Sequence, residues 1–205
     1  MQHFEKRIPI FLELGLRAEA VPALKDYIDL LWDANTQLNL ISRKMTFEEL
    51  IDNHLIDCLL PLKYFPKDVK VAADFGSGGG LPGVVYAIQF PEVRFRLYEK
   101  SRLKQEFLNH CKKQVAPNLE VLGEIPPQLG QIEIVMSRAF KPIDVLLEMS
   151  RSFYQKGGKY FLLKARREKI DEELAAAQKQ FKNLKAQITP LTSPVLEVER
   201  HLVQI

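Results

Sequence analysis

The chain has 205 residues, of which 46% are hydrophobic and 27% charged, and its net charge is +3. This size and composition are typical of one soluble globular domain with a sizeable core, so neither a disordered chain nor one that depends on disulfides is expected. No stretch approaches the roughly 18 apolar residues of a membrane-spanning helix, and the first residues lack the apolar core of a signal peptide. The weak positive charge is compatible with an anionic partner but does not identify one.

The two cysteines, Cys58 and Cys111, lie far apart and have no metal-ligand spacing. Each falls in a helix-like stretch, so we expect buried free thiols and no metal site. Free thiols suit a reducing cytoplasm, where we expect the protein to be located.

Residues 1–66 are predicted to form a helical extension, because their apolar residues recur at helical spacing without strand alternation. One amphipathic helix has Pro22 in its first turn and ends before a loop at residues 39–44. Thr46 and Glu49 form a capping box at the start of another helix. That helix ends near residues 66–68, which we interpret as the junction to the next part of the chain.

Residues 67–205 alternate between strand-like and helix-like segments, which predicts an α/β fold: a mostly parallel sheet with helices on both faces, packed with the extension as one globular unit. The expected strands are Val69–Phe75, Val93–Glu99, Leu119–Leu122, Glu133–Ser137, Tyr160–Lys164, Ala186–Thr189 and Glu197–Ile205. The expected helices are Pro82–Gln89, Leu103–Val115, Pro142–Phe153 and Arg167–Leu184.

A glycine-rich loop, DFGSGGGLPG, follows the first of these strands. A strand, a glycine-rich turn and a helix start together form a nucleotide-type cradle, because glycine lets the backbone approach a ligand and the helix start presents free N–H groups. Gly76, Gly78 and Gly80 give G-x-G-x-G, whereas Gly78, Gly80 and Gly83 fit the dinucleotide pattern G-x-G-x-x-G.

Two carboxylates at strand ends favour the first register. Asp74, just before the glycines, would repel a dinucleotide pyrophosphate but attract the sulfonium and amino groups of S-adenosylmethionine. Glu99, at the end of the second strand, can accept both ribose hydroxyls of an adenosyl group, in S-adenosylmethionine and NAD alike. The predicted cofactor is S-adenosylmethionine; an NAD-type oxidoreductase is the alternative, although the sequence offers no catalytic residue set for it.

The loop, as D-x-G-[ST]-G-x-G-L-P-G, resembles that of the RsmG (GidB) family of bacterial methyltransferases. The resemblance extends from about residue 35 to residue 205 and includes Asn39-Leu40, Asn53-His54-x-x-Asp57, Ser137-Arg138-Ala139-Phe140, Lys164 and Glu199-Arg200-His201-Leu202. It implies a Rossmann-like methyltransferase fold with a seven-stranded sheet. It also implies transfer of a methyl group from S-adenosylmethionine to N7 of a guanine in 16S ribosomal RNA.

The resemblance also implies site residues. Cofactor contacts would fall on Gly76, Leu81, Gly123, Glu124 and Arg138. Together with the loop argument, the predicted cofactor-binding set is Asp74, Gly76, Ser77, Gly78, Gly80, Leu81, Glu99, Gly123, Glu124 and Arg138. The expected partner is 16S ribosomal RNA or the small-subunit particle, bound by a monomer that does not contact membranes.

Guanine N7 carries a lone pair and needs no general base, so catalysis would rest on alignment of the reactants. Arg138 and Lys164 stand at the ends of the fourth and fifth strands, where α/β sheets bind ligands, and with Arg200 they are the candidate catalytic residues. The alternatives are a surface ion pair for Arg138 and a Lys164 that extends to solvent. For His54 we expect a structural or RNA-positioning role, with a local hydrogen bond to Asp57.

Two other functions stay open at this stage. One is a methyltransferase that acts on another RNA or on a small molecule. The other is a non-catalytic RNA-binding relative, which Leu103 keeps open because the family has a basic residue there.

Overall fold

The computed structural model describes residues 2–205. The N-terminal part is helical, as predicted. It comprises α1 (Gln2–Glu13), α2 (Val21–Leu38), α3 (Phe47–Glu49), a π-helical segment (Leu50–Leu55) and α4 (Ile56–Leu59).

The predicted start and stop signals of these helices are confirmed. Pro22 lies in the first turn of α2, which ends where Asn39 takes a left-handed φ of 50°. The Thr46 hydroxyl accepts a hydrogen bond from the Glu49 amide at 3.1 Å, and the Glu49 carboxylate accepts one from the Thr46 amide at 2.7 Å. This capping box fixes the entry into the helix that carries His54 and Asp57.

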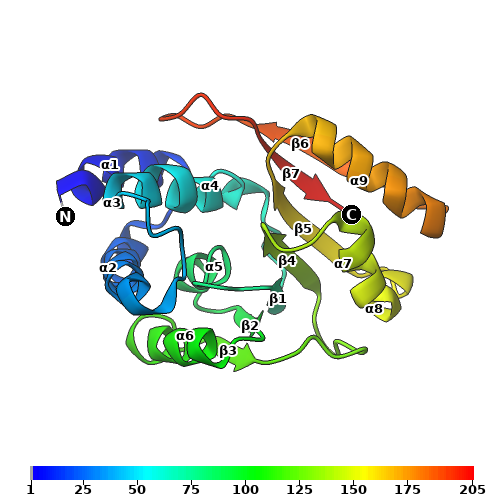
Figure 1. Ribbon diagram of the computed structural model, residues 1–205, viewed down its shortest axis with the longest axis horizontal. Coiled ribbons are helices and arrows are strands. Elements are labelled where there is room, and N and C mark those ends of the chain that lie inside the picture. Colours follow the sequence, from blue (N-terminus) through cyan, green and yellow to red (C-terminus); the bar gives the residue numbers. More distant parts are fainter. Residues whose placement is uncertain (1) are drawn as a thin grey trace.

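A seven-stranded sheet forms the centre of the molecule (Figure 1). Its strands are β1 (Val71–Phe75), β2 (Arg94–Tyr98), β3 (Leu119–Leu122), β4 (Ile134–Arg138), β5 (Lys159–Lys164), β6 (Gln187–Leu191) and β7 (Arg200–Gln204). The strand order is β3-β2-β1-β4-β5-β7-β6, and all neighbouring strands are parallel except for the two antiparallel pairs that β7 forms with β5 and β6. The prediction of a mostly parallel sheet with seven strands is confirmed.

Helices cover both faces of the sheet. Successive side chains along each strand point to opposite faces, so one strand contributes to two separate cores. The connecting helices are α5 (Gly83–Gln89), α6 (Arg102–Gln114), α7 (Ile143–Met149), α8 (Arg151–Gln155) and α9 (Arg167–Gln180). Ala72 of β1 packs in the core shared with α5 and α6, whereas Ala73 and Phe75 pack in the core under α7, α8 and α9.

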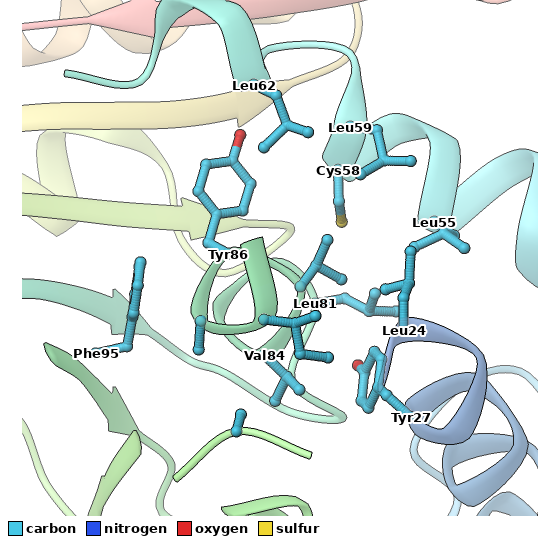
Figure 2. Packing of buried hydrophobic residues seen from close by; sticks show 14 of the residues in the cluster. Leu24, Tyr27, Leu55, Cys58, Leu59, Leu62, Leu81, Val84, Tyr86 and Phe95 are labelled. Carbon is cyan, nitrogen blue, oxygen red and sulfur yellow. The ribbon is translucent and has the colours of Figure 1, made fainter. Parts of the chain in front are cut away.

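The N-terminal helices share the first of these cores. Figure 2 shows Leu24 and Tyr27 of α2 beside Leu81, in the glycine loop, and Val84, just after it. Cys58 lies in the same cluster; it and Cys111 are buried free thiols, as predicted, and burial raises the pKa of each to about 12. Burial of these apolar side chains in one shared core holds the N-terminal helices against the sheet. Side chains of these helices thereby reach the ends of the strands.

Several predicted elements were wrong in extent. The helix expected over Arg167–Leu184 ends at Gln180, the first strand begins at Val71 and not at Val69, and the sixth strand extends to Leu191 and not to Thr189. The single helix expected over Pro142–Phe153 is broken at Ser150, whose φ of −120° is not helical and whose hydroxyl donates to the Leu146 carbonyl at 2.8 Å. The last strand begins at Arg200 and not at Glu197.

Candidate functional site

The glycine loop takes backbone conformations that other residues adopt at a cost. Gly76, Gly78 and Gly80 have φ values of 71°, 56° and 94°. The Gly80 amide donates to the Ser77 carbonyl at 2.7 Å, which closes a tight turn. Tyr27 of α2 donates its hydroxyl to the Gly79 carbonyl at 2.7 Å, so the N-terminal helices support the loop directly.

Asp74 and Gly83 lock the two ends of the loop together. The Asp74 carboxylate accepts a hydrogen bond from the Gly83 amide at 3.1 Å, and the Asp74 carbonyl accepts one from the Ser77 hydroxyl at 3.0 Å. A Cβ at Gly83 would lie 2.6 Å from that carboxylate and 2.4 Å from a methyl of Leu97, so only glycine fits. Asp74 is 1% exposed, and burial raises its pKa to about 7.

The loop borders a cavity of about 530 Å³, which we call the loop cavity. The predicted cofactor residues that line it are Gly76, Ser77, Gly78, Leu81, Glu99, Gly123 and Arg138. Within residues 2–205, Asp74 and Gly80 lie behind its lining, and Glu124 lies outside it with a side chain 82% exposed, 3.6 Å from Lys100.

Glu99 is held at the edge of the loop cavity by two backbone amides. One carboxylate oxygen accepts from the Gly78 amide at 2.9 Å, and the other accepts from the Ser101 amide at 2.8 Å. A carboxylate oxygen has two acceptor sites, so each oxygen keeps one for a ligand. The carboxylate is thus fixed in place and able to accept two hydroxyl groups.

The chain turns sharply after β4, at the predicted Ser137–Phe140 motif. Ala139 has a φ of 53°, an unusual conformation for alanine that stores strain and is found often at functional sites. The turn places the Phe140 ring over Gly76, where a Cβ would lie 2.1 Å from a ring carbon. Gly76 is therefore required both by its φ and by the ring above it.

A second cavity, of about 800 Å³, lies at the ends of β4 and β5; we call it the basic cavity. All three candidate catalytic residues, Arg138, Lys164 and Arg200, line it. Its other charged residues are Asp57, Lys141, Arg166, Lys169 and Glu173. The two cavities share His54, Arg138, Ala139, Phe140 and Lys141, so they meet at the end of β4.

Asp57 bridges two of the candidate arginines. Its carboxylate accepts from Arg200 Nε at 2.7 Å and lies 3.8 Å from Arg138 Nη1. Burial raises the pKa of Asp57, and the hydrogen bond from Arg200 opposes that shift. Arg138 is only 16% exposed, which excludes the surface ion pair considered above.

His54 does not bond to Asp57, so the predicted local hydrogen bond is wrong. Its Nδ1 instead lies 2.8 Å from Arg138 Nη2. His54 lies in the π-helical segment, whose backbone bonds span five residues, so residues three apart do not stack as they do in an α-helix. Burial and, to a lesser degree, the charges of Arg138 and Arg200 together lower the pKa of His54 to about 4.

Lys164 points inward. Its ammonium donates to Glu173 at 2.6 Å and to the Lys141 carbonyl at 3.1 Å, and its side chain is 15% exposed. The same Glu173 oxygen accepts from the Ile143 amide at 3.0 Å. Lys164 thus connects α9 to the turn after β4, and the alternative of extension to solvent is wrong.

Sequence reasoning did not foresee several residues that line the cavities. Phe140 and Asp57 stood in recognised motifs but received no role at the site, whereas Glu173 lies in the helix expected over Arg167–Leu184, for which no site role was predicted. In residues 2–205, no cluster of three or more histidine, cysteine, aspartate or glutamate side chains is placed to hold a metal ion. None of the helices in the described chain is long and apolar enough to cross a membrane.

Comparison with known proteins identifies similar chains. The family model described as "rRNA small subunit methyltransferase G" matches residues 20–203. Ribosomal RNA small subunit methyltransferase G 1 of Bdellovibrio bacteriovorus is 71% identical over 204 residues, covering 100% of this chain and 99% of that protein. Ribosomal RNA small subunit methyltransferase G of Brachyspira hyodysenteriae is 35% identical, covering 89% of this chain and 88% of that protein.

Among solved structures, precorrin-6y C5,15-methyltransferase from Geobacter metallireducens is similar with a TM-score of 0.55. Its identity is 13%, and the match covers 80% of this chain and 90% of that one. At this identity the likeness concerns the fold alone.

Proposed function

Because the chain belongs to the family of rRNA small subunit methyltransferase G, we propose that its loop cavity holds the methyl donor and its basic cavity holds the RNA substrate. The protein is an S-adenosylmethionine-dependent enzyme that methylates N7 of a guanine in 16S ribosomal RNA. The division of the site between the two cavities is inferred from their linings.

The loop cavity fits the cofactor in two ways. Gly76 leaves space where any side chain would clash, and the fixed Glu99 carboxylate keeps acceptor sites for the ribose hydroxyls. When bound, S-adenosylmethionine supplies a methyl group that its sulfonium makes electrophilic. We propose that Gly76, Ser77, Gly78, Leu81, Glu99 and Gly123 contact it, while Asp74 and Gly80 shape the loop from behind and Glu124 acts only through its backbone.

The basic cavity suits a nucleotide. Arg138 and Arg200 share one buried carboxylate, that of Asp57, so the two guanidinium groups keep a net positive charge that can bind a phosphate. Lys164 is held beside them by Glu173. We propose that Arg138 and Arg200 hold phosphate or the base, and that Lys164 positions the turn at Lys141. Guanine N7 needs no general base, so these residues act by alignment and exclusion of water.

The N-terminal helices take part in the site, since they contribute His54 and Asp57 to the basic cavity. We propose a boundary between residues 66 and 67, with the two parts acting as one monomer on the small subunit or its RNA in the cytoplasm. Sedimentation of the purified protein, alone and with small subunits, tests the monomer. A dimer that persists at nanomolar concentration would contradict it.

The observation that carries the proposal is that the two cavities meet at Arg138, His54 and Phe140. The test uses purified protein, tritiated S-adenosylmethionine and small subunits from a strain that lacks its own guanine-N7 enzyme. We expect one 7-methylguanosine per 16S RNA, located by mass mapping. Absence of transfer, or methylation of a different atom, would contradict the proposal.

A further inference from the structure

The tautomer of His54 is determined by its neighbour. Arginine has only N–H donors, so the 2.8 Å contact between Arg138 Nη2 and His54 Nδ1 requires Nδ1 to accept. A neutral imidazole that accepts at Nδ1 carries its proton on Nε2. The lowered pKa of His54, about 4, agrees with a neutral ring at physiological pH.

The Nε2–H group of His54 has no hydrogen-bond acceptor among residues 2–205. Nor is it sealed in the core, because His54 lines both the loop cavity and the basic cavity. With Nδ1 engaged by Arg138, the Nε2 edge is the part of the ring that can bind a ligand. The π-helical segment Leu50–Leu55 holds this ring where the cavities meet.

Guanine must present a defined edge at that meeting point. Its N7 has to face the methyl donor, and O6 is the neighbouring acceptor on the same edge of the base. Adenine has N7 in the same place but carries an N6 amino group, a donor, where guanine has O6. A fixed N–H donor beside the reacting nitrogen therefore accepts guanine and rejects adenine.

We propose that His54 determines base specificity by donating its Nε2–H to O6 of the target guanine. This inference rests on the proposed function and adds a residue to it. Arg138, which lines both cavities, then also holds His54 in the tautomer whose Nε2 carries the proton.

Two substitutions of His54 separate the donor role from a role in holding Arg138. His54→Asn keeps an acceptor near the position of Nδ1 but loses the distal donor. His54→Gln can place an amide N–H near the position of Nε2 but loses the Nδ1 acceptor. His110→Asn, on the exposed side of α6 and outside both cavities, is the matched control.

The substrate is varied in the same way. Small subunits are reconstituted with 16S RNA that carries either guanosine or 2-aminopurine at the methylated position. 2-Aminopurine keeps N7 but lacks O6 and the proton on N1. Single-turnover methyl transfer is measured for each enzyme on each substrate, and calorimetry with S-adenosylhomocysteine together with thermal unfolding checks that the variants are folded.

On guanosine we expect His54→Asn to slow transfer about tenfold, the scale of one lost hydrogen bond that leaves a buried acceptor unpaired. His54→Gln should stay within about threefold of wild type, and His110→Asn should equal it. 2-Aminopurine should slow wild type about tenfold and should not slow His54→Asn further, because interacting groups are not additive.

If the rate losses from His54→Asn and from 2-aminopurine were additive, or if His54→Gln lost more than His54→Asn, the role of His54 would be contradicted. The proposed function would be unaffected by either result. A wild-type enzyme that methylates neither the guanosine nor the 2-aminopurine substrate would overturn the proposed function and the role of His54 together.

Discussion

The loop cavity and the basic cavity are adjacent, but they are built differently. The loop cavity is built around a continuous stretch of chain, from Gly76 to Leu81, with a single carboxylate, that of Glu99, fixed at its edge. The basic cavity is formed by charged side chains that meet from distant parts of the chain, such as Asp57 and Arg200, which are 143 residues apart.

This difference predicts how each cavity should respond to mutation. A backbone site fails when a side chain intrudes, whereas a side-chain site fails when one member of a charge network is removed. Damage to one cavity should therefore leave the ligand of the other largely unaffected.

Gly76→Ala should have the largest effect. The new methyl group would lie 2.1 Å from a ring carbon of Phe140, on a backbone with φ of 71°. We expect affinity for S-adenosylhomocysteine, measured by calorimetry, to fall at least about a hundredfold because both strain and overlap must be relieved. Gly157→Ala is the control: its φ is 78°, but nothing lies within 4 Å of the added carbon, so cofactor affinity should not change.

Asp57→Asn should abolish most RNA methylation and leave cofactor affinity nearly intact. The change removes the carboxylate that pairs with Arg200 and Arg138 and leaves two half-buried guanidinium groups uncompensated. Chemical denaturation should show a loss of about 3 kcal/mol, the lower end for a buried pair that loses one partner.

Asp171→Asn is the matched control for that loss, because the Arg167–Asp171 pair is exposed. It should cost less than about 0.5 kcal/mol. An equal loss in the two variants would show that Asp57 contributes no more than a surface charge.

The lowered pKa of His54 predicts that the stability of the protein depends on pH. Its pKa is lowered to about 4 in the folded protein, so between pH 6.5 and 4 the unfolded chain binds the extra proton and stability falls as the pH falls. From pH 7 to pH 5 this group should cost about 1–2 kcal/mol. Denaturation at both pH values should show a smaller fall for His54→Asn than for wild type; identical falls would contradict a neutral His54.

Glu124→Gln should have the smallest effect. The side chain is exposed and only 3.6 Å from an equally exposed Lys100, outside the lining of the loop cavity. We expect affinity for S-adenosylhomocysteine to change less than twofold. A tenfold loss would place the carboxylate itself in contact with the cofactor.

The same contrast explains what sequence reasoning could reach. The loop cavity was predictable, because glycines, Asp74 and Gly83 stand within ten residues and their order reflects one local turn. The strands were predictable from their apolar runs and alternate packing. The basic cavity was predictable only in part: Arg138, Lys164 and Arg200 were named through their motifs, while the contacts that hold them were not.

Those contacts depend on long-range geometry. No spacing rule connects Asp57 to Arg200 or Glu173 to Lys164, because the sheet order and the docking of the N-terminal helices bring them together. The His54–Asp57 prediction failed for a local reason: an α-helical spacing was assumed where the backbone is π-helical.

Hydrogen exchange of the backbone amides, with and without saturating S-adenosylhomocysteine, tests the division between the two cavities most directly. We expect strong protection at residues 76–81 and around Gly123, with little change at residues 163–166. Protection concentrated at residues 163–166, with none in the glycine loop, would contradict it.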